Sequence, residues 1–193
     1  MSCCCDGSSA IPREYIDLIK WAAGKVDAPF FKLATTYELA GIVRERVFCY
    51  ELYHQLRLGM GQSNKLSLNG EIDKRGHFDF APKDRKNPDF VFHIPGTHSG
   101  NTLVIEVKGS LDSPDGIQKD IKTILTFVGK YSYKAGVFVL YNHSFEEFAN
   151  KVSDNLRELS SEPMANSVFI LSIKKPHGDC EEHLLSDVKI VSQ

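Results

Sequence analysis

The alternation of apolar and polar positions along the chain predicts a succession of helices and strands. Helical spacing, together with start and stop signals, predicts helices over about 12–23, 36–58, 117–128 and 144–159. Runs rich in β-branched and aromatic residues predict strands over 65–73, 88–94, 102–108, 135–141 and 168–173, with a last short strand at 187–191. The run 135–141 is almost continuously apolar, which is typical of a strand covered on both faces. This order of elements indicates an α/β fold in which helices flank a mixed central sheet.

The second predicted helix, over residues 36–58, places acidic side chains near the expected core. Its apolar positions recur at helical spacing, and Gly59 ends it. These apolar positions are Leu39, Val43, Val47, Tyr50 and Leu58. Glu51 and His54 fall on or beside this stripe, whereas Glu45 falls well away from it. We therefore expect Glu51 to lie closer to the core than Glu45.

The strands over 88–94 and 102–108 predict a β-hairpin, because the residues between them are a cluster of turn formers. Folding the hairpin about the middle of that turn places Asp89 opposite Glu106, since the two lie about equally far from it. Side chains alternate along a strand, so Glu106 and Lys108 share one face. Two carboxylates and an ammonium are therefore expected to converge at one end of an otherwise apolar hairpin.

The composition is that of an ordinary globular protein. At 193 residues, with 42% hydrophobic and 25% charged residues, the chain is expected to form a single domain over 1–193, with disordered residues at 1–10. No apolar run approaches the roughly 20 residues of a membrane helix. The N-terminus lacks the layout of a secretory signal, which predicts a cytoplasmic location. The five cysteines show neither a disulfide framework nor the spacing of a zinc site.

The net charge of −2 counts mildly against a nucleic-acid-binding protein, which usually has a basic excess. Basic residues nevertheless cluster on both sides of the hairpin motif. Lys74, Arg75, Lys83, Arg85 and Lys86 precede it, and Lys119 and Lys122 follow it. Most such runs are solvated surface, so this clustering is compatible with a nucleic-acid partner without requiring one.

The converging charges suit the hydrolysis of a phosphodiester. That reaction needs a nucleophilic water and neutralisation of charge at phosphorus, which Mg²⁺ supplies when one or two carboxylates hold it. Asp89 and Glu106 are spaced to be those carboxylates, and the Val107 carbonyl would complete the set. Lys108 would orient water or stabilise negative charge. The alternative is a turn aspartate beside a solvated Glu-x-Lys pair, but burying charges without a purpose is expensive.

The residues Pro88-Asp89, followed on the next strand by Glu106-Val107-Lys108, resemble the core signature of the PD-(D/E)XK nuclease superfamily. The resemblance covers a core of about 38–141 and implies a restriction endonuclease-like fold with the order α-β-β-β-α-β. It implies a divalent-metal-dependent endonuclease that hydrolyses phosphodiester bonds in DNA with Mg²⁺ or Mn²⁺. By the same resemblance, Asp89 and Glu106 would be metal ligands and Lys108 the catalytic lysine.

The resemblance also implies contributions from two helices. Many members add an acidic residue from the helix before the sheet, for which Glu51 is the candidate, although a surface pair of Glu51 with Gln55 is the alternative. The helix after the motif often adds a Gln or Lys, and Gln118 is favoured over Lys122. Roles for His54 and for His77 stay open.

Three functions are compatible with the sequence. The first is an endonuclease acting on DNA, with a homodimeric state, a role in restriction, defence or repair, and RNA as a substrate all left open. The second is an inactive domain of the same fold that binds nucleic acid or a protein partner. The third is an enzyme of sugar or acyl chemistry, which the absence of a Gly-rich phosphate loop, a Gly-x-Ser-x-Gly turn and a Cys/His zinc pattern disfavours.

Overall fold

The computed structural model describes residues 11–61, 66–70, 81–84, 86–96 and 100–189. Within these ranges six strands form one mixed sheet, in which spatial order follows chain order from β1 to β6. The strands are β1 Ser67–Gly70, β2 Phe90–His93, β3 Leu103–Lys108, β4 Ala135–Tyr141, β5 Val168–Ile173 and β6 Glu181–Leu184. The pairs β3–β4 and β4–β5 are parallel and the other three are antiparallel. The predicted α/β class with a mixed sheet is confirmed.

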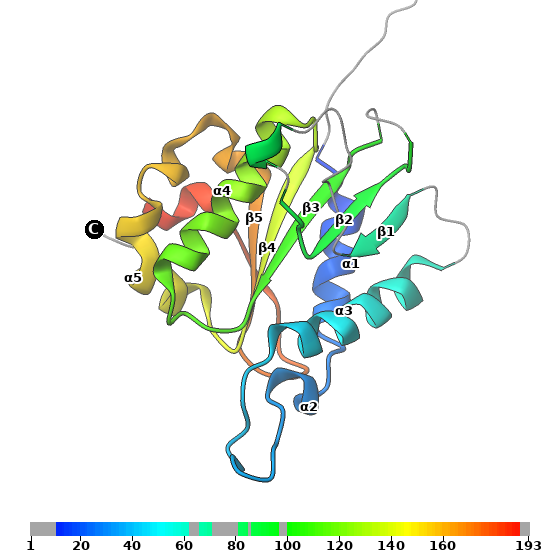
Figure 1. Cartoon of the computed structure of the whole chain (residues 1–193), viewed down its shortest axis with the longest axis vertical. Coiled ribbons are helices and arrows are strands. Elements are labelled where there is room, and N and C mark those ends of the chain that lie inside the picture. The colour runs from blue at the N-terminus through cyan, green and yellow to red at the C-terminus, as the bar shows by residue number, and fades with distance from the viewer. Residues whose placement is uncertain (1–10, 62–65, 71–80, 85, 97–99, 190–193) are drawn as a thin grey trace, which may run out of the picture.

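Helices cover both faces of the sheet (Figure 1). The helices are α1 Arg13–Ala23, α2 Ala28–Phe31, α3 Glu45–Met60, α4 Pro114–Lys130 and α5 Phe145–Leu156. Helices α1, α2 and α3 share one hydrophobic core with one face of the sheet, whereas α4 and α5 share a second core with the other face. In β3 the side chain of Val107 belongs to the first core and that of Val104 to the second, as strand alternation requires.

The strand β4 lies in the middle of the sheet and is buried along its whole length, as its apolar run predicts. Helix α4 packs closely against it at Gly136. A Cβ atom at Gly136 would lie only 2.0 Å from Cγ2 of Ile124. The absence of a side chain at this position therefore sets how closely α4 approaches the sheet.

The register of the hairpin agrees with the prediction. Phe90 pairs with Ile105, and continuing this register by one residue places Asp89 opposite Glu106. Leu103 to Lys108 also pair in parallel with Ala135 to Leu140 of β4. The end of the hairpin that carries the charges thus lies inside the sheet rather than at its edge.

Two predicted elements are wrong in part. Helix α3 begins at Glu45 and not at Thr36, because residues 32–44 form a loop closed by paired backbone hydrogen bonds between Leu33 and Ile42. Gly41 has φ +80° in this loop, a conformation that no α-helix contains. Of the predicted last strand at 187–191, residues 187–189 belong instead to a 3₁₀ turn over 185–189, and residues 190 and 191 lie outside the described part of the chain; the strand at this end of the sheet is β6.

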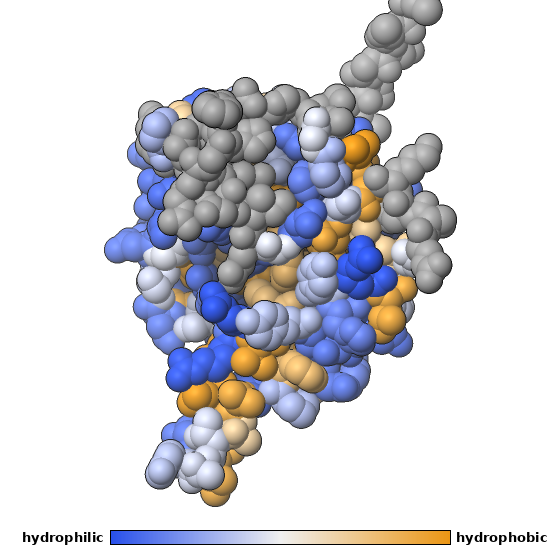
Figure 2. Space-filling view, turned by 45° about the vertical axis from the view of Figure 1, so that its right-hand side comes forward, coloured by the Kyte–Doolittle hydropathy of each residue, from blue (hydrophilic) through white to orange (hydrophobic). Residues whose placement is uncertain are grey.

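The 32–44 loop projects from the body of the molecule and exposes apolar side chains, including Leu39 at 88% of its maximum (Figure 2). The remaining predicted helices and strands occur within a few residues of their predicted bounds, except that parts of the strand over 65–73 lie outside the described residues. Among the helices that the structure describes, none combines the length and apolarity needed to cross a bilayer.

Candidate active site

The carboxylate of Asp89, which lies just before the start of β2, accepts a hydrogen bond from a backbone N–H of β3 in place of a backbone carbonyl. Its Oδ2 accepts a hydrogen bond of 2.7 Å from the backbone N–H of Val107. One more step of the hairpin register would set Pro88 opposite Val107, and proline has no N–H to donate. The N–H and C=O of one strand residue point to the same side. The Val107 carbonyl is therefore directed toward Asp89 and receives no ladder hydrogen bond from Pro88.

Glu106 lies on the face of β3 that is turned toward α4. It is only partly exposed to solvent, and the nearby backbone N–H of Asp89 acts to lower its pKa. Burial raises the pKa of Glu106 well above its ordinary value, and repulsion from the carboxylates of Asp89 and Asp120 raises it further. The two acids that the sequence places opposite each other are thus electrostatic neighbours.

Lys108, two residues further along the same face of β3, is held by carboxylates from two helices. Its Nζ lies 2.9 Å from Oδ2 of Asp120 on α4 and 3.4 Å from Oε2 of Glu45 at the start of α3. Burial alone would lower the pKa of Lys108, but the hydrogen bond and charge of Asp120, followed by those of Glu45, raise it above the ordinary value. The ammonium is therefore charged and fixed in position.

The site contains four carboxyl groups and one ammonium. Burial raises the pKa of Asp89 to about 6, the charges of Glu45 and Asp120 raise it as well, and the Val107 hydrogen bond and Lys108 act in the opposite direction. When all four acids are ionised the site has an excess of negative charge that Lys108 alone does not balance. Two neighbouring, partly buried acids whose pKa values are raised, here Asp89 and Glu106, are typical of functional sites.

The structure places Glu45, and not Glu51, in this site. The side chain of Glu51 accepts a hydrogen bond of 2.6 Å from Gln55 one turn further along α3, which is the surface pair that formed the alternative. The buried row of α3 consists of Phe48, Leu52, Leu56 and Met60. Glu45 lies three residues before Phe48 and so continues that row, beyond the end of the core. The choice of Glu51 over Glu45 was wrong because the apolar row predicted from the sequence runs through Val47, whereas the buried row of the helix runs through its neighbour Phe48.

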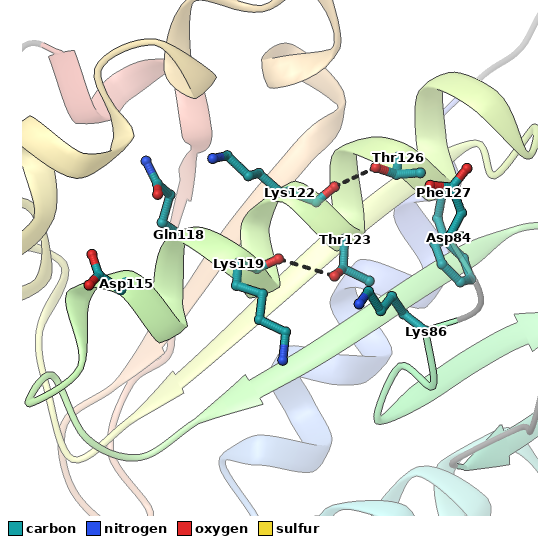
Figure 3. A pocket seen from close by; sticks show the side chains of 9 residues that line it. All are labelled: Asp84, Lys86, Asp115, Gln118, Lys119, Lys122, Thr123, Thr126 and Phe127. Atoms are coloured by element: carbon teal, nitrogen blue, oxygen red, sulfur yellow. Dashed lines mark hydrogen bonds between the residues drawn. The ribbon is translucent and has the colours of Figure 1, made fainter. Parts of the chain in front are cut away.

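The structure likewise brings Asp120, and not Gln118, to the site from α4. Nε2 of Gln118 donates to the backbone carbonyl of Asn155 at 2.7 Å, so this side chain is directed toward α5. Lys122 lies on the outer side of α4 together with Gln118 (Figure 3). His54 is exposed on α3. His77 lies outside the described residues.

Asp120 has a signal in the sequence that could have identified it. It lies three residues after Ile117 and one before Ile121, both fully buried, so it is at the border of the apolar face of α4. A single acid at such a border is common in surface helices, and only the position of Lys108 on β3 makes it significant.

A cleft of about 660 Å³ opens beside Asp89, between the start of α3 and the edge formed by β1 and β2. It is lined by Glu45, Arg46, Cys49, Tyr50, Tyr53, Asn69, Gly70, Asp89 and Phe90. The aromatic rings and the two carboxylates lie in the same cleft. This arrangement gives a ligand a route from solvent to the buried acids.

The donor set fits a small, hard divalent cation. Mg²⁺ prefers oxygen ligands and is commonly held by one or two carboxylates together with water. Asp89, Glu106 and the Val107 carbonyl supply oxygens at one strand end, and the raised pKa values show that positive charge would be favourable there. Across the described ranges, no three His, Cys, Asp or Glu side chains are arranged closely enough to form a ready-made metal centre.

The fold and the site together define an α/β protein with a buried acidic centre at one end of its sheet. Comparison of the chain with protein-family models, curated proteins and solved structures found no match.

Proposed function

We propose that this protein is a divalent-metal-dependent phosphodiesterase that acts as an endonuclease on DNA. The observation that supports the proposal most is the convergence of Asp89 and Glu106 at one strand end, with the Lys108 ammonium two residues away on the same face. Apolar packing gives no reason to bury these charges, and the free-energy cost of burying them is large.

The order of elements also supports this proposal. In the described part of the chain, α3, β1, β2, β3, α4 and β4 follow one another as helix, three strands, helix and strand. This is the order implied by the resemblance to the PD-(D/E)XK nucleases. The two acids and the lysine lie on β3 and immediately before β2, as that resemblance requires.

In the proposed reaction Asp89, Glu106 and the Val107 carbonyl would hold Mg²⁺ or Mn²⁺. When bound, the cation supplies an activated water and neutralises charge on the phosphate. Lys108 contributes a fixed positive charge, because Asp120 and Glu45 hold its ammonium between them. From this position the ammonium stabilises the charge that develops on a phosphate oxygen or orients the attacking water.

The main alternative is a domain of the same fold that binds nucleic acid or a protein without cutting it. The ion pairs of Lys108 favour this alternative, because the ammonium is already engaged by two of the four carboxylates. An ammonium so engaged can serve structure alone, and structural ion-pair networks also shift pKa values. The two functions differ in whether the protein cuts DNA, and the nuclease additionally requires that cleavage depend on both Lys108 and the acids.

The experiment is to incubate the purified protein with supercoiled plasmid and linear DNA in Mg²⁺, in Mn²⁺ and in chelator. We expect metal-dependent cleavage, and a loss of about 10²-fold or more in Asp89→Asn and in Lys108→Met, because each substitution removes a charge that the reaction requires. Asn keeps an oxygen that can accept the Val107 hydrogen bond, so Asp89→Asn tests the charge rather than the fold.

Asp154→Asn and Lys151→Met are the matched controls, since both residues are exposed on α5, away from the site. Cleavage that continues in chelator, or at the wild-type rate in Asp89→Asn or Lys108→Met, contradicts the metal mechanism. Binding of DNA without any cleavage in either metal supports the inactive domain instead.

A further inference from the structure

We propose that a groove on the outer side of α4 binds the phosphate backbone of the nucleic acid on which the site acts. The groove has a volume of about 370 Å³ and lies between α4 on one side and Asp84 and Lys86 on the other. It is lined by Asp84, Lys86, Asp115, Gln118, Lys119, Lys122, Thr123, Thr126 and Phe127 (Figure 3). The inference builds on the proposed function, because it concerns how the same substrate is held.

Three lysines bring positive charge to this groove. Lys86 follows the 3₁₀ turn at 82–84, and Lys119 and Lys122 lie on α4; all three are exposed. None of the three forms an ion pair with a residue that the structure describes. Figure 3 shows Lys86 and Lys119 extending into the same space from opposite walls. The three lysines thus gather positive charge at one groove of a chain whose net charge is −2.

The acids of the groove are engaged elsewhere. The carboxylate of Asp84 accepts hydrogen bonds from the ammonium of Lys130 and from the hydroxyl of Tyr131. These two bonds hold the 3₁₀ turn at 82–84 against the end of α4. Asp115, at the other end of the groove, accepts a hydrogen bond of 3.4 Å from Asn155. The negative charge of Asp84 is therefore balanced by Lys130, and the three lysines of the groove outnumber the one remaining carboxylate, Asp115, so the groove attracts an anion.

The polar groups of the groove favour a contact with phosphates rather than with bases. The hydroxyls of Thr123 and Thr126 donate to backbone carbonyls one turn earlier, at 3.1 and 2.7 Å. Their hydrogen atoms are thus committed to the helix, and the flexible ammonium groups remain as the principal donors. Lysines that contact phosphates provide affinity without reading sequence.

The groove and the acidic site share two segments of the chain. Lys119 is adjacent to Asp120, whose carboxylate contacts Lys108, and Lys86 lies three residues before Asp89. A phosphodiester chain that follows the groove along α4 therefore approaches the strand end where the acids converge. The repeated charges of such a chain match a row of cations better than a single small phosphate does.

The experiment measures binding of a fluorescently labelled DNA duplex by anisotropy, in EDTA and at 50 to 200 mM KCl. The variants are the double substitution Lys119→Gln with Lys122→Gln and the control Lys25→Gln with Lys151→Gln. The control removes the same charge from exposed lysines outside the groove. We expect the groove variant to bind at least several-fold more weakly and to lower the slope of log K against log salt by about 2. The control should resemble the wild type.

Equal binding by the groove variant and the control overturns the inference. Displacement of the DNA by poly-glutamate at equal charge, with the same dependence on Lys119 and Lys122, also overturns it, since the groove would then accept any polyanion. Because EDTA removes metal, the result is independent of cleavage. Binding through these lysines by a protein that never cuts DNA upholds the groove and contradicts the nuclease. If the variant without Lys119 and Lys122 both cuts and binds DNA like the wild type, the proposed role of the groove is wrong and the proposed nuclease activity is unaffected.

Discussion

Asp89 is partly buried beside other carboxylates, and its ionisation therefore opposes folding. In the native protein burial raises the pKa of Asp89 to about 6, whereas an aspartate in an unfolded chain has a pKa of about 3.9. The folded state binds the proton more tightly than the unfolded state. The stability that this proton contributes is fully present below about pH 4 and is lost as the pH rises to about 6.

From this sign we predict that Asp89→Asn stabilises the metal-free protein at pH 7.5 but not at pH 4. The gain is on the order of 1–3 kcal/mol, since each pKa unit corresponds to about 1.4 kcal/mol. Urea unfolding in EDTA at the two pH values measures it, with the exposed Asp154→Asn as control. A variant that is less stable than the wild type at pH 7.5 would show that the Val107 hydrogen bond outweighs the cost of the charge.

Single residues of the site were predictable to different degrees. Asp89, Glu106 and Lys108 follow from strand alternation and from the position of one turn, which are local rules. Glu45 and Asp120 reach Lys108 from helices that are distant in sequence, so their roles depend on how α3 and α4 pack. Sequence periodicity gives the buried face of a helix only approximately. An error of one residue in the position of the apolar row of α3 was enough to favour Glu51 over Glu45.

Helix α4 provides both Asp120 and the lysines of the groove, and its position depends on contact with β4. We predict that Gly136→Ala displaces α4 and lowers the free energy of unfolding by about 1–3 kcal/mol, because the new Cβ would lie 2.0 Å from Ile124. Thermal unfolding measures the loss of stability. DNA cleavage should fall as well, since Asp120 would no longer hold Lys108 in place.

Gly129→Ala on α4 is the matched control. A Cβ at this position meets only Met164, at an ordinary contact distance of 3.6 Å, so the substitution should be neutral or stabilise the helix by about 0.5–1 kcal/mol. A Gly136→Ala protein as stable and active as this control would mean that α4 is free to shift without consequence for the site.

The helices and strands themselves were mostly predictable, and the exceptions have physical reasons. Strands β4 and β5 and helix α1 follow from local apolar patterns that the packing reinforces. The loop at 32–44 contains apolar residues at helical spacing, but Gly41 and the pairing of Leu33 with Ile42 override that spacing. Strand β6 carries Glu181, Glu182 and His183, and it exists because β5 offers an edge, which no local pattern reveals.

The whole molecule combines a net charge of −2 with an acidic centre inside its sheet, so a bound cation should stabilise the fold. We predict that Mg²⁺ or Mn²⁺ raises the thermal unfolding midpoint at pH 7.5. At a hundred times the dissociation constant the gain is about 2.7 kcal/mol, which corresponds to roughly 5–10 °C for a chain of this size. The shift should shrink toward pH 5, where protons compete with the metal for Asp89 and Glu106.

Glu106→Gln separates a specific site from a general effect of salt on an acidic protein. It keeps the size of the side chain and removes one carboxylate of the proposed metal set, so the metal-induced shift of the unfolding midpoint should disappear. Asp154→Asn removes an equal charge from the surface and should keep the full shift. If Glu106→Gln responds to metal like the wild type, any cation that stabilises this protein binds elsewhere, and the proposed chemistry loses its site.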